Sequence, residues 1–158
     1  MNKTRMLSRA SMLSALYVVL TLFANALGLA NGAIQVRLSE ALTVLPIFFP
    51  EAIWGLGVGC FISNIITGCA LPDIIFGTLA TVIGAIGTRI FRENRLLAIM
   101  CPVLSNSVIV PFVLKFAYGL GDAWYYLALT VCIGEIISCV LLGSLIIKIT
   151  DKYYNILK

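Results

Sequence analysis

The sequence predicts an all-α integral membrane protein: a compact bundle of six transmembrane helices with both termini in the cytoplasm. Three observations support this prediction. Of the 158 residues, 61% are hydrophobic, against about 45–50% in soluble globular domains. The apolar residues form runs close to the roughly 20 residues that a helix needs to cross a bilayer. The lysines and arginines are distributed unevenly between these runs, as in membrane proteins of fixed orientation.

The apolar runs fill the chain. Five of them are candidate spans, and a shorter one is a possible sixth; in chain order they lie at 10–36, 41–50, 52–72, 74–88, 96–114 and 123–147. Only Glu135 interrupts the last run. We therefore expect residues 1–158 to form a single six-helix transmembrane domain without a linker or a soluble module.

The basic residues decide whether the short run 41–50 crosses. If it crosses, nine of the eleven lie on one side of the membrane, and only Arg37 and Lys115 lie on the other. If it does not, the later spans invert and most basic residues lie outside, against the positive-inside rule. We therefore expect six spans, with Pro46 kinking the short one or thinning the bilayer locally. The net charge of +4 then reflects orientation, and no nucleic-acid partner is expected.

Residues 1–26 also resemble a signal peptide, because basic residues precede an apolar run. The apolar stretch continues to Ala30, which is long enough to span, so we expect a retained first helix.

Several kinds of chemistry are excluded by residue type. The chain has no histidine, so Ser-His and Cys-His catalysis and most metal sites are absent. Its five cysteines show no Cys-x-x-Cys spacing, so neither zinc nor disulfides are indicated. It has no P-loop motif. We expect neither an enzyme nor a bound cofactor, and any active transport would need partners or an ion gradient.

The segment Gln35–Pro46 places Arg37 and Glu40 between two apolar runs. Residues 33–38 alternate as an extended stretch would, and Ser39 can cap a helix that starts at Glu40. Such a segment suits a lid or a ligand clamp. The alternative is a solvated loop whose two charges neutralise each other.

Small residues at helical spacing predict close helix contacts. In 52–72 they are Gly55, Gly59 and Ser63, and in 74–88 they are Gly77, Ala80, Gly84 and Gly87; internal packing explains both sets. The first span has two such pairs, Ala10 with Ser14 and Ser11 with Ala15. Because they lie in its cytoplasmic half, docking of a partner protein is an equal alternative there.

Polar groups near mid-membrane are few. Glu135 and Asn106 lie at similar depths in the last two spans, and a carboxylate there costs about 2.5–3.5 kcal/mol, so Glu135 should face a cavity or a partner. Several residues share its helix face and would form a shaft with an aromatic mouth: Trp124, Tyr125, Ala128, Val131 and Cys132. This suits a flat, hydrogen-bonding ligand. The alternative is a structural hydrogen bond between Glu135 and Asn106.

Three stretches, QVRLSEALTVLP at 35–46, EAIWGLGVGCFISNIITG at 51–68 and DIIFGTLATVIGA at 73–85, resemble the QueT family. These are the queuosine-precursor substrate-binding (S) components of energy-coupling factor (ECF) transporters, which are ABC importers of vitamin-like compounds. The resemblance implies a multi-pass protein of the bacterial cell membrane that binds a 7-deazaguanine from outside, in the cyano or aminomethyl form or as queuine. It also implies docking of the first helix, through Ala10 with Ser14 or Ser11 with Ala15, onto a transmembrane coupling protein (EcfT) that works with two cytoplasmic ATPases.

A guanine-like edge presents an N–H beside an exocyclic amine, and one carboxylate can accept from both. Glu135 is the first candidate for that carboxylate, with Glu40 and Asp73 behind it. Asn106 would serve the ring carbonyl, and Arg37 would close over the site. The remaining candidates are two aromatic residues that would stack on the ring and three weaker polar ones: Trp124 and Tyr125, and Asn64, Thr78 and Thr81.

Other functions stay open. The ligand of the S component could be another small vitamin-like heterocycle. A proton-coupled secondary carrier would use Glu135 as its proton site, and a structural membrane protein would bind no ligand.

Overall fold

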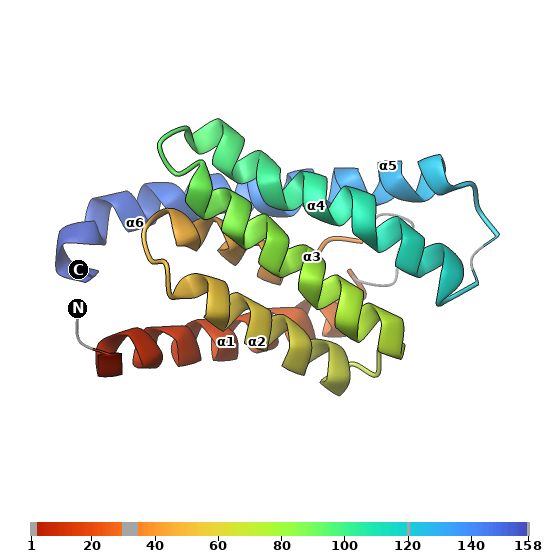
Figure 1. Cartoon of the computed structure of the whole chain (residues 1–158), viewed down its shortest axis with the longest axis horizontal. Coiled ribbons are helices and arrows are strands. Elements are labelled where there is room, and N and C mark those ends of the chain that lie inside the picture. Colours follow the sequence, from red (N-terminus) through yellow and green to blue (C-terminus); the bar gives the residue numbers. More distant parts are fainter. Residues whose placement is uncertain (1–2, 30–34, 120, 158) are drawn as a thin grey trace.

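The computed structural model of the protein describes residues 3–29, 35–119 and 121–157 and is built from helices. In chain order they are α1 (Lys3–Ala26), η1 (Leu38–Ile47), α2 (Ala52–Ile66), α3 (Leu71–Ile90), α4 (Arg95–Phe116), α5 (Trp124–Glu135), η2 (Ile136–Leu142) and α6 (Gly143–Leu157). The last three follow one another without a break and form one long rod (Figure 1). The predicted all-α class is confirmed.

Four helical segments are long and apolar enough to cross a membrane: α1, α3, α4 and the rod from α5 to α6. Two further apolar helices, η1 and α2, are shorter. Because α1 begins and α6 ends at the same end of the bundle (Figure 1), the number of crossings is even, and η1 and α2 bring it to the predicted six. The first helix ends at Ala26, ten residues before the end of its apolar run at 36.

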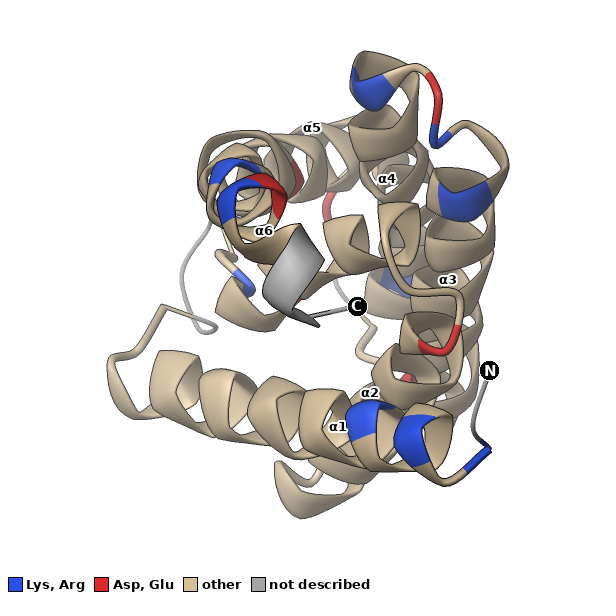
Figure 2. Ribbon diagram, turned by 90° about the vertical axis from the view of Figure 1, so that its left-hand side faces the viewer, with Lys and Arg blue, Asp and Glu red and all other residues tan. Residues whose placement is uncertain are grey.

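Basic residues gather at the end of the bundle where α1 begins and α6 ends, and Figure 2 looks onto this end. They lie at the start of α1, around the turn between α3 and α4, and on α6. This distribution is the one on which the predicted orientation rests; Lys158 lies outside the described residues. The cytoplasmic placement of this end stays a prediction.

The short crossing segment is a 3₁₀-helix, η1, at the centre of the bundle. Its residues from Ser39 to Ile47 are all buried, and it packs against α1, α2, α3, α4, η2 and α6. A 3₁₀-helix rises about 2.0 Å per residue, against 1.5 Å in an α-helix, so the ten residues of η1 reach about 20 Å rather than 15 Å. This extra reach lets a short segment traverse most of the bilayer core.

The expected start of this helix is wrong in two respects. The helix begins at Leu38, not Glu40, and no side chain caps its first turn. Ser39, the expected cap, accepts a hydrogen bond from Thr21 of α1 instead (2.9 Å between the hydroxyl oxygens). Arg37 has the expected extended backbone, whereas residues 33 and 34 of the predicted extended stretch lie outside the described part of the chain.

The helix α1 packs closely on α2 because two glycines of α2 leave room for its backbone. A Cβ atom at Gly55 would lie 2.6 Å from the carbonyl oxygen of Ala10, and one at Gly59 would lie 2.9 Å from that of Ser14. The neighbouring pair on α1, Ser11 and Ala15, is exposed. The structure thus separates the two small-residue pairs: one packs against α2, and the other faces away from the bundle.

Candidate functional site

A polar cavity of about 440 Å³ opens at the end of the bundle opposite the termini. Its walls come from the end of α1, the start of η1, the α2–α3 junction and the end of α4. The residues that line it are Thr21, Ala24, Asn25, Gln35, Val36, Arg37, Ser39, Asn64, Thr67, Gly68, Cys69, Asp73, Leu114 and Tyr118. Three of the predicted site residues, Arg37, Asn64 and Asp73, are among them.

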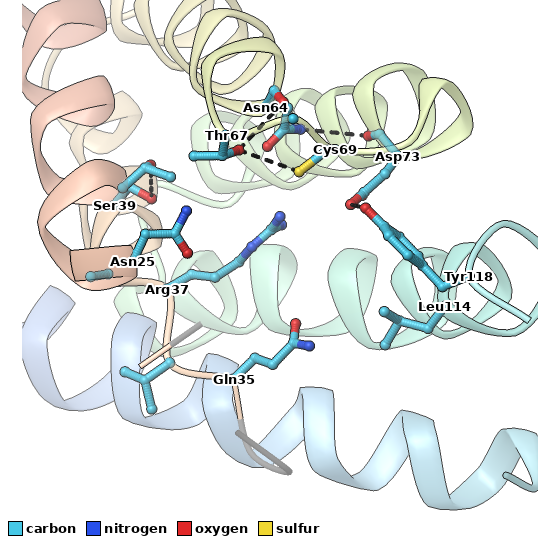
Figure 3. Close-up of a pocket in the computed structure, with 14 residues that line it drawn as sticks. Asn25, Gln35, Arg37, Ser39, Asn64, Thr67, Cys69, Asp73, Leu114 and Tyr118 are labelled. Atoms are coloured by element: carbon cyan, nitrogen blue, oxygen red, sulfur yellow. Dashed lines mark hydrogen bonds between the residues drawn. The ribbon is translucent and has the colours of Figure 1, made fainter. Parts of the chain in front are cut away.

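Arg37 crosses this cavity. Its side chain extends from the start of η1 toward the α2–α3 junction (Figure 3). The Nη1 atom is enclosed and has no hydrogen-bond partner, although the guanidinium interacts electrostatically with Asp73 and Glu40. The cavity therefore holds a strong donor that the protein leaves unsatisfied.

Asp73 faces Arg37 from the first turn of α3, where the helix dipole favours a negative charge. Its Oδ2 accepts a hydrogen bond from the Tyr118 hydroxyl (2.9 Å), and that hydroxyl accepts one from the Ala70 amide (3.2 Å). Burial and the nearby Asp73 carboxylate raise the pKa of Tyr118, so its hydroxyl stays protonated and donates. The buried Oδ1 of Asp73 has no partner.

Asp73 is further fixed by Asn64, whose side-chain amide donates to the Asp73 backbone carbonyl (3.5 Å; Figure 3). No ion pair joins Asp73 to Arg37 in the part of the chain that the structure describes. Asp73 and Arg37 thus both line the cavity, and each has one buried side-chain atom without a hydrogen-bond partner. A buried polar group without a partner costs about 1–3 kcal/mol, so hydrogen bonds from a ligand to both atoms would favour its binding.

A second group of polar residues, Glu40, Glu135 and Asn106, is buried and does not line the cavity; we call it the inner polar cluster. Glu40 is fully buried; its Oε1 accepts from the hydroxyls of Tyr17 (2.5 Å) and Thr81 (3.0 Å), and its Oε2 has no partner. Glu135 is 3% exposed and interacts electrostatically with Glu40 and Arg37.

Asn106 completes the inner polar cluster. It is fully buried and lies beside the Glu135 carboxyl, but neither of its amide atoms has hydrogen-bond geometry with a partner. Cys139 links the Glu135 carboxyl group to the backbone of η1, since its sulfur lies 3.3 Å from Glu135 Oε2 and 3.5 Å from the main-chain carbonyl oxygen of Glu40. Glu135 and Asn106 therefore lie close together, as the sequence predicts.

The other predicted contact residues lie away from the cavity. Tyr125 is 75% exposed, and Trp124 packs against Phe112 with 5.4 Å between ring centroids. Thr78 is half-buried with an unpartnered hydroxyl. None of them lines the cavity. Thr81 does not line it either, but its hydroxyl donates a hydrogen bond to Glu40.

Sequence reasoning missed two tyrosines that organise the site. Tyr17 holds Glu40, and Tyr118 holds Asp73. For Tyr118 the signal was weak: α3 and α4 are consecutive helices joined by a short turn, but Tyr118 lies farther in sequence from that turn than Asp73 does. A tyrosine hydroxyl in the middle of an apolar helix, as at Tyr17, also needs a polar partner.

A helical bundle with several apolar crossings and a polar cavity at one end defines a multi-pass membrane protein with a site of small-molecule size. The family described as QueT transporter matches residues 7–152. The chain belongs to this family.

One curated relative is the queuosine precursor transporter QueT of Lactococcus lactis subsp. cremoris (strain MG1363). It is 33% identical over 82 residues, which cover 52% of this chain and 48% of the relative. The match therefore spans about half the length of that relative. No solved structure is significantly similar to the chain.

Proposed function

We propose that the chain is the membrane-embedded substrate-binding S component of an ECF-type importer, and that it captures a queuosine precursor from outside the cell. Membership of the QueT transporter family supports this, as does the name of the Lactococcus relative. The observation that carries the proposal is the cavity, whose lining brings together Asp73 and Arg37, each with one side-chain atom that has no hydrogen-bond partner.

These two atoms complement a guanine-like ring. Its ring carbonyl is an acceptor for a guanidinium, and the adjacent ring N–H and exocyclic amine are donors for a carboxylate. Of the three carboxylates predicted for this role, Asp73 lines the cavity whereas Glu40 and Glu135 do not. We therefore assign the donor edge to Asp73 and the carbonyl to Arg37. The cavity volume of about 440 Å³ falls in the usual range for small-molecule sites, about 300–1,000 Å³.

Energy for uptake would come from a coupling protein of the EcfT type and two ATPases, because the chain has no P-loop. The docking surface on α1 is the exposed pair Ser11 and Ala15, since Ala10 and Ser14 pack against the glycines of α2. Small residues on such a face let a partner helix approach closely.

Reconstituted liposomes test this proposal. Uptake of a labelled 7-deazaguanine should require the coupling protein, the ATPases and ATP. Ser11→Leu should abolish uptake while the isolated variant still binds ligand. Val58→Leu, which places the same leucine side chain at an exposed position of α2, is the control and should transport normally.

Three results would overturn parts of this proposal. Uptake by the chain alone under a proton gradient would favour a secondary carrier that uses Glu135. Normal uptake by Ser11→Leu would show that the exposed face of α1 is not the docking surface. Binding of an unrelated vitamin-like heterocycle in place of every 7-deazaguanine would keep the S-component role and change its substrate.

A further inference from the structure

The segment that carries Arg37 is held against the rod by contacts of its main chain. Gln35, two residues before Arg37, lies against Gly134 near the end of α5: a Cβ atom at Gly134 would overlap the Gln35 carbonyl oxygen and lie 3.0 Å from its carbonyl carbon. Three residues after Arg37, the main-chain carbonyl oxygen of Glu40 lies 3.5 Å from the sulfur of Cys139. The backbone of Arg37 therefore runs between two contacts with the same rod.

The glycine at position 134 is explained by the close approach of this segment and not by the helix itself. Gly134 is buried within α5 and does not have a positive φ, and alanine is the better helix former. The overlap with Gln35 involves main-chain atoms, which cannot turn away as a long side chain can. Glycine thus allows the two backbones to touch, as small residues do between membrane helices.

The contact at Gly134 sets how far Arg37 reaches into the cavity. Arg37 follows Gln35 in an extended conformation (φ −94°, ψ 93°), and its side chain crosses the cavity toward the α2–α3 junction (Figure 3). Close carbon–oxygen contacts are usually about 3.3–3.6 Å long, so a methyl group at position 134 would displace the Gln35 carbonyl by roughly 1 Å. A group that binds a ligand must be held to within about 0.5 Å. A displacement of this size would therefore disrupt a hydrogen bond from the guanidinium to a ligand.

We propose that Gly134 is the positioning residue for Arg37. This rests on the proposed function, in which the Arg37 guanidinium binds the ring carbonyl of the ligand. Gly134 does not line the cavity. It contacts the Gln35 carbonyl, and the extended segment from Gln35 to Arg37 fixes the guanidinium relative to that contact. A substitution at Gly134 should consequently change ligand affinity only through Arg37.

A double-mutant cycle, measured by isothermal titration with unsubstituted 7-deazaguanine, tests this proposal. Arg37→Met should weaken binding by roughly 10- to 150-fold, the range for a hydrogen bond to a charged group. Gly134→Ala should weaken binding by roughly tenfold or more, up to the loss in Arg37→Met. In the Arg37→Met protein the further change Gly134→Ala should alter the affinity by less than about twofold, because the group that Gly134 positions is gone.

Gly84→Ala is the matched control. A Cβ atom at Gly84 would lie 2.6 Å from the Cα atom of Pro102, so this substitution also forces two buried backbones apart, those of α3 and α4. Neither residue lines the cavity. Gly84→Ala should lower the melting temperature and leave the affinity for the ligand within about twofold of the unmodified protein.

Val36→Gly is a second variant, and it leaves α5 unchanged. Val36 joins Gln35 to Arg37, and a glycine there loosens the link between them because it frees the backbone. Val36→Gly should weaken binding by roughly two- to fivefold, and this loss should disappear in the Arg37→Met protein. If Gly134→Ala does not fold, this variant decides the matter, and an unchanged affinity of Val36→Gly would overturn the proposal.

Two results with a folded Gly134→Ala protein would also overturn the positioning role. One is binding within about twofold of the unmodified protein. The other is a loss that adds in full to that of Arg37→Met, which would show that Gly134 acts on another part of the site. In either case a weakened Arg37→Met protein leaves the proposed function standing. Unchanged binding by Arg37→Met would overturn the assignment of Arg37 to the ring carbonyl, and this inference with it.

Discussion

Replacing Asp73 with Asn tests the assignment of the donor edge of the ligand. In the structure one carboxylate oxygen accepts from Tyr118 at 2.9 Å, and the other is buried without a partner. The asparagine keeps the size of the side chain. If its oxygen keeps the bond to Tyr118, its amide N–H groups take the place of the free oxygen and face the ring N–H of the ligand.

The expected loss of binding affinity follows from the hydrogen bond that the substitution removes. A hydrogen bond to a charged acceptor contributes about 1.5–3 kcal/mol, and the substitution also leaves a buried donor facing a donor. Asp73→Asn should therefore weaken binding of unsubstituted 7-deazaguanine by roughly 10- to 150-fold. Tyr118→Phe is the matched control, because it removes the bond to Asp73 but keeps the free oxygen. It should cost only about 0.5–1.5 kcal/mol, or roughly two- to tenfold.

The assay is isothermal titration of detergent-purified proteins, with thermal unfolding of each variant recorded to verify the fold. An Asp73→Asn protein that melts normally and binds within about twofold of the unmodified protein would refute the assignment. The recognition role would then pass to Glu40 or Glu135, as the sequence first suggested. Equal losses in Asp73→Asn and Tyr118→Phe would mean that Asp73 acts through Tyr118 and not on the ligand.

Two further substitutions test how the site is supported. Gly55→Ala should lower thermal stability by about 1–3 kcal/mol, because its Cβ would lie 2.6 Å from the carbonyl oxygen of Ala10; an unchanged melting temperature would mean that α1 moves aside at little cost. Tyr17→Phe removes one of the two donors to Glu40 Oε1 and should destabilise the fold by about 1–3 kcal/mol. A Tyr17→Phe protein as stable as the unmodified one would show that Glu40 is adequately held without that hydroxyl.

The sequence alone was sufficient to predict an all-α membrane protein and the number of its helical segments. In a bilayer each crossing helix satisfies its own backbone hydrogen bonds, so hydropathy read along the chain identifies spans one at a time. The uneven distribution of lysine and arginine then made 41–50 a crossing segment, and η1 (Leu38–Ile47) occupies that place in the bundle. The glycines of 52–72 also indicated a close helix contact, which α1 makes at Gly55 and Gly59.

Only the tertiary structure decided which polar residues share a cavity and which helix faces look inward. Lipid is as apolar as the core of the bundle, so the sequence of an apolar helix gives little indication of which face points inward. The sequence therefore could not predict that Tyr125 is exposed, nor which of the pairs Ala10–Ser14 and Ser11–Ala15 packs against the bundle. The cavity depends on contacts between distant segments, such as the bond from Tyr118 to Asp73 across 45 residues. The local sequence pattern determines which segments form membrane helices, whereas the site is formed by residues that packing brings together from distant segments.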